Sequence, residues 1–243
     1  MIATMKYLDF TLPTPEQNLA CDEALLHLAE TGRAGETLRF WEPAQFFVVL
    51  GYSRPLQADV HVASCRTQKI PILRRLSGGG TVLQGPGCLN FSLVIDTRRS
   101  PELRGITGTN RFIMTRHQRA LERVTGRPVK IQGDTDLTVD RLKFSGNAQR
   151  RAEHFALFHG TFLLSFDIPQ VERSLPLPAK QPDYRQGRPH GQFLTNLQLT
   201  SEPIKQALRT DWNGREPLDN LPTEEINRLA STRYASDEWN EKF

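Results

Sequence analysis

RRLSGGGTV, residues 74–82, places three consecutive glycines directly after a basic stretch with the character of a strand. Glycine has no Cβ, so it tolerates positive φ and lets backbone N–H groups approach a bound group, although ordering it costs entropy. We therefore predict that Gly78, Gly79 and Gly80 contact a substrate. The glycines alone leave the alternative open, a tight turn or flexible loop that binds nothing.

The arginines that precede the glycines favour the interpretation that the loop binds a ligand. Side chains alternate faces along a strand, so Arg75 and Ser77 point to one side while Arg74 points to the other, and one arginine can face a ligand. A second segment, DTDLTVDRLKFSGNAQ at 134–149, again places a lone basic residue, Lys143, beside a Ser-Gly pair. Two polar segments marked by glycine predict one composite pocket.

Four motifs occur in a fixed order along the chain: RRLSGGGTV at 74–82, GCLNFSLV at 87–94, KFSGNAQ at 143–149 and HGT at 159–161. In this order and spacing the chain resembles the lipoate–protein ligase family, which belongs to the wider group of biotin and lipoate protein ligases and octanoyltransferases. The likeness covers nearly the whole chain, from residue 5 to residue 240. The resemblance implies an α+β fold with mixed, largely antiparallel sheets flanked by helices, as in biotin and lipoate ligase catalytic domains.

The length and composition are typical of one globular catalytic domain. The chain has 243 residues, enough for one substantial core, and we expect a single domain over 1–243. It is 38% hydrophobic and 24% charged, and it has no apolar run near the roughly 20 residues that span a bilayer. The start of the chain lacks the pattern of a secretion signal. We therefore expect a cytoplasmic protein without a membrane span.

Cysteine usage and charge exclude several kinds of site. Cys21, Cys65 and Cys88 are widely separated and form no Cys-x-x-Cys pair, which argues against a zinc cluster or a disulfide framework. The formal net charge is only +4, and the basic residues are spread along the chain. Nucleic-acid binding is thus weakly supported. A positive rim around an active site, which would serve phosphates or an acidic protein partner, is an equally good interpretation.

The first half of the chain carries clear signals for helices and strands. Residues 6–12 predict a strand, and Thr14-Pro15-Glu16-Gln17 is a helix start with a capping box, so a helix should run to about Glu30. The segments 37–41 and 46–52, rich in aromatic and β-branched residues, predict two strands that pair with each other.

The next segments extend this mixed pattern. We expect a helix over 59–68, extended chain over 70–76, and a strand over 89–95. Apolar residues at helical offsets predict a helix around 113–124 that Gly126 ends, and strands then dominate as far as Phe166.

The last third mixes a long loop with two short helices. The segment 176–192 is rich in Pro, Gln and Gly and predicts a mobile loop. Two helices should follow, capped by Ser201 and by Thr223. Because strands and helices do not alternate regularly, the order favours an α+β fold with a mixed or largely antiparallel sheet.

The resemblance implies the reaction of an ATP-dependent lipoate–protein ligase. ATP and lipoate would give lipoyl-AMP, and the lipoyl group would pass to a lysine of a lipoyl-acceptor domain or carrier protein. Lys143 is the predicted catalytic residue, because its ammonium could bridge the acyl carboxylate and the α-phosphate and stabilise the negative charge there. The ordinary alternative is a solvated lysine on a strand.

Magnesium should accompany the triphosphate, and it prefers one or two carboxylates with retained water. Asp136 is the predicted ligand, because the family places an acidic residue near this position. Asp134 and Asp140 are close enough in the sequence to leave the choice open, and an exposed turn aspartate is the ordinary alternative.

The resemblance also implies the substrate-binding residues. The glycine loop, with Arg75 and Ser77, would cover the adenylate and the acyl chain, and the HGT motif would line the same cavity, with His159 as a lining residue only. Asn90 is a candidate nucleotide contact, and Asn196 lies in a family element near the binding site. The full set of predicted binding residues is Arg75, Ser77, Gly78, Gly79, Gly80, Thr81, Asn90, Ser145, Gly146, His159, Gly160 and Thr161.

Two features depart from the familiar ligase pattern. Gln84 stands where many lipoate ligases carry histidine, so no role of that histidine transfers. The sequence also stops soon after Trp239-Asn240, where two-domain ligases continue into an accessory domain. We therefore expect an enzyme that uses a separate accessory protein, one that works without it, or one that is not an ATP-dependent ligase.

The main alternative is an octanoyltransferase of the same superfamily, which moves an acyl group from acyl carrier protein through a cysteine thioester without ATP. Single-domain transferases of this kind tend to carry their cysteine in the second half, and no cysteine follows Cys88. Cys88 itself enters a strand that looks buried, where an inert thiol is expected. A biotin ligase is less favoured because its Gly-Arg-Gly-Arg loop is absent. A binding module without catalysis is disfavoured by the presence of both Lys143 and the glycine loop.

Overall fold

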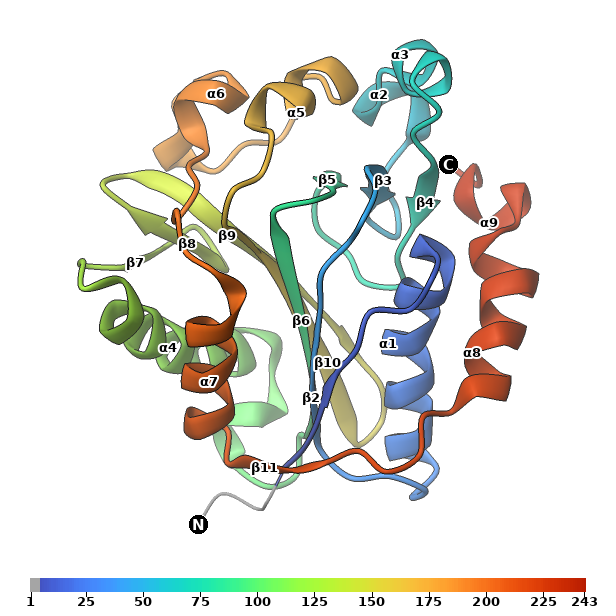
Figure 1. Ribbon diagram of the computed structural model, residues 1–243, viewed down its shortest axis with the longest axis vertical. Coiled ribbons are helices and arrows are strands. Elements are labelled where there is room, and N and C mark those ends of the chain that lie inside the picture. Colours follow the sequence, from blue (N-terminus) through green and yellow to red (C-terminus); the bar gives the residue numbers. More distant parts are fainter. Residues whose placement is uncertain (1–4) are drawn as a thin grey trace.

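The computed structural model describes residues 5–243, and an eight-stranded sheet runs through its centre (Figure 1). β1 (Met5–Asp9) pairs in parallel with β2 (Thr37–Trp41) and with β11 (Gly214–Pro217). All other neighbours in this sheet are antiparallel. Beyond β2 the order across the sheet is β6 (Cys88–Asp96), β10 (Phe155–Leu163), β9 (Leu142–Arg151), β8 (Asp136–Val139) and β7 (Lys130–Gln132).

A second sheet has three strands, in the order β4 (Ile72–Arg74), β3 (Phe47–Leu50) and β5 (Val82–Gln84). β3 is parallel to β4 and antiparallel to β5. The glycine loop therefore connects the two edge strands of this small sheet. The predicted fold class, mixed and largely antiparallel sheets with flanking helices, is confirmed.

The prediction that 37–41 and 46–52 pair with each other is wrong. β2 pairs with β1 and β6 in the large sheet, whereas β3 belongs to the small sheet. Pro43 lies between the two strands and has no N–H to continue a ladder. Every residue of both strands is buried, so no exposed face indicates which partner each strand takes.

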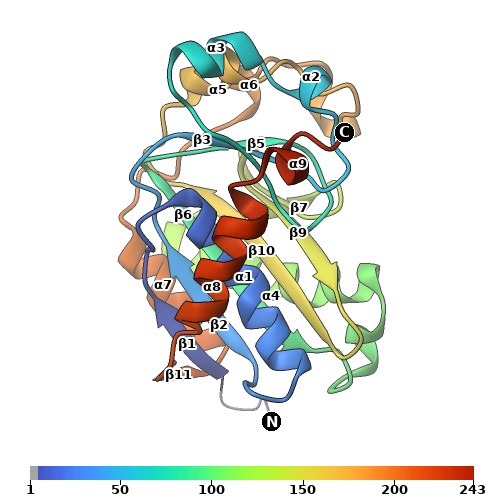
Figure 2. The same cartoon turned by 90° about the vertical axis from the view of Figure 1, so that its right-hand side faces the viewer.

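One face of the large sheet is covered by α1 (Pro15–Glu30), α8 (Thr223–Leu229) and a π-helical turn at Ala230–Tyr234, which lie in front in Figure 2. α1 begins as predicted. The hydroxyl of Thr14 accepts from the N–H of Gln17, and the side chain of Gln17 accepts from the N–H of Thr14, both at 3.2 Å. This capping box satisfies donors that the first helical turn leaves without partners.

Two helices cover the opposite face, α4 (Ile106–Thr125) and α7 (Ser201–Asp211). A 3₁₀ turn at Pro101–Arg104 comes just before α4. α4 ends as predicted at Gly126, whose φ is 64°, and the N–H of Gly126 donates to a carbonyl of the last turn. The predicted cap residues of the two C-terminal helices are displaced by one position. Their N-caps are the preceding residues, Thr200 and Pro222.

Short helices form a third group beside the small sheet, at the top of Figures 1 and 2. The single helix predicted for 59–68 is two helices, because Val60 has extended backbone angles between them. The predicted loop 176–192 contains a 3₁₀ turn and the start of a helix. The elements of this group are α2 (Leu56–Asp59), α3 (Val62–Thr67), α5 (Ile168–Ser174), the 3₁₀ turn Asp183–Arg185 and α6 (His190–Phe193). The C-terminal helix, α9 (Asp237–Asn240), lies against β4.

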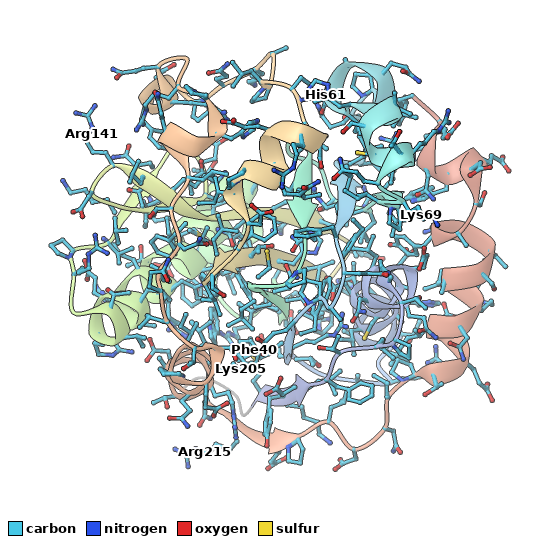
Figure 3. All side chains as sticks on the ribbon, turned by 45° about the horizontal axis from the view of Figure 1, so that its top comes forward. Phe40, His61, Lys69, Arg141, Lys205 and Arg215 are labelled. Atoms are coloured by element: carbon cyan, nitrogen blue, oxygen red, sulfur yellow. The ribbon has the colours of Figure 1, made fainter. Side chains whose placement is uncertain are left out.

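The hairpin between β8 and β9 projects from one side of the molecule. Its two turn residues, Asp140 and Arg141, have φ values of 49° and 65°, as a two-residue type I′ turn requires. The side chain of Arg141 points away from the body of the protein (Figure 3). Among the described residues, no helix is both long enough and apolar enough to span a membrane. The sequence predicted that the start of the chain is not a secretion signal. Residues 1–4 of that start lie outside the described part of the chain.

Candidate active site

A cavity of about 970 Å³ is lined by residues of both sheets and by the segment 176–194. Most predicted site residues line it. The exceptions are Ser77 and Gly78, and Asn196, whose amide instead bonds the backbone of Phe166 at 2.9 Å. The predicted residues that line the cavity are Arg75, Gly79, Gly80, Thr81, Asn90, Asp136, Lys143, Ser145, Gly146, His159, Gly160 and Thr161.

Arg75 holds the glycine loop in shape. Its guanidinium donates to the carbonyls of Gly78 at 2.6 Å and Gly80 at 2.8 Å, and its Nε donates to the hydroxyl of Ser77 at 2.9 Å. Burial lowers the pKa of Arg75 to about 10. Among the described residues, the N–H groups of Gly78, Gly79 and Gly80 have no hydrogen-bond partner. The loop therefore has two of its carbonyls, those of Gly78 and Gly80, bound by Arg75 and its N–H groups available, which is the arrangement of an anion site.

Gly79 needs to be glycine. Its φ is +88°, and a Cβ at this position would lie 2.9 Å from Nη2 of Arg75. A Cβ on Gly51, at the end of β3, would overlap the carbonyl oxygen of Gly79. The loop thus packs tightly between Arg75 and the small sheet.

Arg74 points to the other side, as the strand alternation predicts. It is fully buried, and its guanidinium donates to main-chain carbonyls at the ends of β3 and α9. The acceptors are Gly51 at 2.9 Å, Tyr52 at 3.1 Å, Arg54 at 2.7 Å, Trp239 at 3.1 Å and Asn240 at 2.8 Å. Arg74 therefore anchors the C-terminal helix to the base of the glycine loop and does not reach a substrate.

Lys143 and Asp136 form an ion pair in the cavity. The Nζ of Lys143 lies 2.8 Å from Oδ1 of Asp136, and the hydroxyl of Tyr184 donates to Oδ2 at 2.7 Å. Burial and the charge of Asp136 raise the pKa of Tyr184, so its phenol stays protonated. A Cβ on Gly146 would lie 2.8 Å from the lysine Nζ, so this glycine leaves room for the ammonium.

A small polar network lies deeper in the cavity. The amide of Gln84 donates to the hydroxyl of Thr161 at 2.6 Å, and that hydroxyl donates to Oδ1 of Asn90 at 2.5 Å. The Nδ2 of Asn90 donates to Gln84 at 3.1 Å and closes the network. Gln84, the departure from the familiar pattern, therefore orients two predicted binding residues.

Asp22 of α1 was not predicted, although it lines the cavity. Its Oδ1 accepts from Arg39 at 2.7 Å and from Ser92 at 2.8 Å, and its Oδ2 accepts from Nδ1 of His159 at 3.0 Å. Nε2 of His159 lies 2.6 Å from the hydroxyl of Ser77. Burial alone would raise the pKa of Asp22, but the hydrogen bond from His159 and the charge of Arg39 outweigh it and hold the pKa below its usual value.

Thr81, at the far end of the glycine loop, is held by a second acidic residue that sequence reasoning missed. Its hydroxyl donates to Asp59 at 2.5 Å, and Arg54 donates to both oxygens of the same carboxylate, at 2.5 and 2.6 Å. The loop is therefore fixed at both ends, by Arg75 and by Asp59.

The magnesium assignment stays a prediction. Both carboxylate oxygens of Asp136 are engaged, by Lys143 and by Tyr184, and the described residues contain no group of three or more potential His, Cys, Asp or Glu ligands. Asp134 lines the cavity, whereas Asp140 does not and pairs with Arg127 instead. In this conformation the residues do not form a magnesium site, and we derive no catalytic step from one.

None of the three cysteines lines the cavity. Cys88 is 1% exposed, and burial raises the pKa of its thiol to about 12. Such a thiol has almost no thiolate at neutral pH, and the thiolate is the nucleophile. Cys88 therefore lacks the properties of a nucleophilic residue.

Comparison with known proteins identifies the family. The family model described as "Lipoyl protein ligase A/B catalytic domain" matches residues 14–208. A putative lipoate-protein ligase A from Aeropyrum pernix is 30% identical over 238 residues, 91% of this chain and 86% of the relative. The octanoyltransferase LipM of Brevibacillus brevis is 23% identical over 272 residues, 97% of this chain and 98% of the relative.

Solved structures share the fold. A structure of lipoate-protein ligase A bound with ATP has a TM-score of 0.84 and 21% identity, with 98% of each chain covered. A bipartite lipoate protein ligase from Thermoplasma acidophilum, studied with its E2 lipoyl domain, has a TM-score of 0.82 and 20% identity, with 98% of this chain and 96% of that chain covered.

Proposed function

Because the chain belongs to the lipoyl protein ligase A/B catalytic-domain family, we propose that it is an ATP-dependent lipoate–protein ligase that forms lipoyl-AMP and transfers the lipoyl group to a lysine of an acceptor protein. The observation that carries this proposal is the position of Lys143. Its ammonium faces a cavity that no cysteine lines, beside a glycine loop with available N–H groups. This arrangement suits charge stabilisation and not thioester chemistry.

In the first step a carboxylate oxygen of lipoate attacks the α-phosphorus of ATP. A carboxylate–phosphorus bond forms, the bond from the α-phosphorus to the bridging oxygen breaks, and pyrophosphate leaves. Lys143 would stabilise the negative charge that gathers on the α-phosphate, and the N–H groups of Gly79 and Gly80 would bind phosphate oxygens. For Lys143 to do so, its ammonium must exchange part of its contact with Asp136 for the nucleotide.

In the second step the amine of the acceptor lysine attacks the acyl carbon, an amide forms, and AMP leaves as its bond to the acyl carbon breaks. We propose a lipoyl domain or carrier protein as acceptor, and we treat residues 1–243 as one catalytic domain. The T. acidophilum relative is described as bipartite, so a separate accessory protein is part of the test.

The deciding experiment measures the intact mass of a lipoyl-acceptor domain after incubation with the protein, magnesium and free lipoate, with and without ATP. Lipoylation that requires ATP supports the ligase. Pyrophosphate release without acylation supports a ligase whose second step needs an accessory protein. If neither lipoylation nor lipoate-dependent pyrophosphate release occurs, the proposal fails.

An octanoyltransferase is the second candidate, because LipM relatives match almost the whole chain. It would transfer the octanoyl group from octanoyl carrier protein without ATP and would need a cysteine thioester. The buried Cys88 argues against it. The same mass measurement with octanoyl carrier protein, for the wild type and Cys88→Ala, tests it: ATP-independent octanoylation that the variant loses would replace the ligase proposal.

A further inference from the structure

Arg54 is a cation of the cavity with no assigned role in the two steps of the proposed reaction. It lines the cavity together with Thr81 and the glycine loop, and 26% of its side chain is exposed. A Cβ added to Gly51 would overlap the carbonyl oxygen of Gly79 and would also come 3.1 Å from Cγ of Arg54. Because both atoms crowd the same point, the stem of Arg54 lies directly beside the loop.

Asp59 holds the guanidinium of Arg54 in one orientation. Nε donates to Oδ2 of Asp59 at 2.6 Å, and Nη2 donates to Oδ1 at 2.5 Å. The same carboxylate accepts from the hydroxyl of Thr81 at 2.5 Å, and its side chain is only 6% exposed. Burial alone would raise the pKa of Asp59, but the hydrogen bonds from Arg54 and Thr81 outweigh it and hold the pKa below its usual value. The guanidinium is therefore fixed before any ligand binds.

The opposite edge of the same guanidinium is free to bind a ligand. An arginine has five N–H donors, and Asp59 occupies only one on Nε and one on Nη2. Among the described residues, Nη1 of Arg54 donates to no acceptor. The Nη1–Nη2 edge of an arginine carries two parallel N–H groups, which match two oxygens of a phosphate group. Arg54 therefore presents an oriented phosphate-binding edge at the glycine loop.

The two arginines that precede the loop are engaged elsewhere. The guanidinium of Arg75 donates to carbonyls of the loop itself, and that of Arg74 donates to main-chain carbonyls at the ends of β3 and α9. Lys143, which pairs with Asp136 across β9 and β8, is the residue proposed to serve the α-phosphate. The phosphates that leave in the first step need another cation, and Arg54 is the arginine beside the loop that can still bind an anion.

We propose that Arg54 binds the β- and γ-phosphates of ATP through its Nη1–Nη2 edge and holds the pyrophosphate that leaves as the adenylate forms, with Asp59 as the residue that positions it. When the bond from the α-phosphorus to the bridging oxygen breaks, its electron pair stays with that oxygen. The guanidinium stabilises the negative charge that this step places on pyrophosphate. The nucleotide and the adenylation step rest on the proposed function, whereas the diphosphate site itself does not.

Titration calorimetry with three ligands tests the site. ATP, pyrophosphate and AMP are each titrated into the protein in one magnesium-containing buffer, without lipoate or acceptor. Arg54→Gln should weaken the binding of ATP and pyrophosphate by about 10- to 100-fold, the effect of lost hydrogen bonds between charged groups, and should change AMP binding by less than about twofold. Arg66→Gln removes a charge from the surface of α3, where the side chain is 72% exposed, and should bind all three ligands like the wild type. An equal loss for AMP, or no loss for pyrophosphate, would overturn the proposal.

A purely structural role of Arg54 predicts a different result. If Arg54 only supported Thr81 through Asp59, its loss would move the NMR amide signals of Gly79 and Gly80 in the ligand-free protein. We expect these signals to stay in place in the double variant Arg54→Gln/Asp59→Asn, because the asparagine still accepts from Thr81, while pyrophosphate binding weakens as in the single variant. The double variant also leaves no unpaired buried carboxylate, so it serves as the test if Arg54→Gln does not fold. Glycine signals that move with the loss of affinity, or a folded double variant that binds pyrophosphate like the wild type, would overturn the proposal.

Lipoate-dependent pyrophosphate release separates this site from the ligase assignment. If pyrophosphate binding depends on Arg54 but the wild type releases no pyrophosphate from ATP and lipoate, the proposed function fails and the diphosphate site stands. If the wild type releases pyrophosphate and Arg54→Gln keeps the same kcat and the same KM for ATP, the site is wrong and the ligase assignment stands. A wild type that binds neither ATP nor pyrophosphate would also overturn the site.

Discussion

The ammonium of Lys143 lies 2.8 Å from the carboxylate of Asp136, and the two side chains come from adjacent antiparallel strands, β9 and β8. The lysine is only partly exposed, at 24% of its side chain, and the aspartate at 15%. The pair therefore holds a positive charge at a defined point of the cavity before any nucleotide binds. A charge held this close to its point of use needs little reorganisation when negative charge develops in a transition state, beyond the partial exchange of its contact with Asp136.

Lys143→Ala should abolish adenylate formation and leave the fold intact. The substitution removes the ammonium that pairs with Asp136, and loss of a preorganised charge costs about 10²–10³-fold or more in kcat. Lipoate-dependent pyrophosphate release measures the effect, and circular dichroism checks the fold. Lys6→Ala, on the exposed edge pair with Asp219, is the matched control and should keep full activity. Near-normal pyrophosphate release by Lys143→Ala would refute the assignment.

The effects of Tyr184→Phe and Asp136→Asn on the rate of adenylation should not be additive. Each removes one partner of the contact at 2.7 Å, and a hydrogen bond to a charged group contributes about 1.5–3 kcal/mol. Each single change should slow adenylation by roughly tenfold or more. The rise in the activation free energy of adenylation in the double variant should be much smaller than the sum of the two single effects, with a coupling energy between the two substitutions of about 0.5–3 kcal/mol. Additive losses would show that Tyr184 does not act through Asp136.

Gly79→Ala should destabilise the protein, whereas Gly78→Ala should not. Gly79 has a φ of +88°, and its new Cβ would lie 2.9 Å from Arg75, while a Cβ on Gly78 would meet nothing within 4 Å. An alanine held at such a φ costs about 1–3 kcal/mol. Urea unfolding of the two variants measures the difference. Equal unfolding midpoints would mean that Arg75 does not hold the loop in the conformation described.

Local signals in the sequence predicted the elements well, because the interactions behind them are local. The capping box at Thr14 and the left-handed Gly126 each involve residues within one helical turn. The interactions that decide which strands pair are not local, and the sequence did not predict them. β2 and β3 are both fully buried, and their partners lie tens of residues away, so the sequence could not show that they belong to different sheets.

The site follows the same division. The glycine loop and Lys143 lie in continuous motifs, and the sequence predicted that they share one pocket; Gly79, Gly80 and Lys143 do line one cavity. Asp22 sits within the buried side of a helix, where its only signal was a charge among apolar residues, and its partner His159 is 137 positions away. Tyr184 lies in a segment whose composition predicted a loop, and only the folded chain brings it to Asp136.

His117 should make the stability of the protein dependent on pH. It is fully buried, Nε2 accepts from the indole of Trp212 at 3.0 Å, and Nδ1 has no partner among the described residues. Burial lowers the pKa of His117 to about 3, with a smaller contribution from Arg116. In the unfolded chain a histidine titrates near pH 6.5. Below that pH the unfolded state takes up a proton that the folded state does not.

The free energy of unfolding should therefore fall as the pH drops from about 6.5 to about 3, by as much as roughly 1.4 kcal/mol per pH unit from this one group. His117→Gln keeps an acceptor for Trp212 but removes the titration. Urea unfolding, followed by tryptophan fluorescence at several pH values, should show a smaller loss of stability in the variant. His61→Gln, a change at an exposed histidine, is the matched control and should follow the wild type. Parallel curves for wild type and His117→Gln would show that His117 is not the group that limits stability in acid.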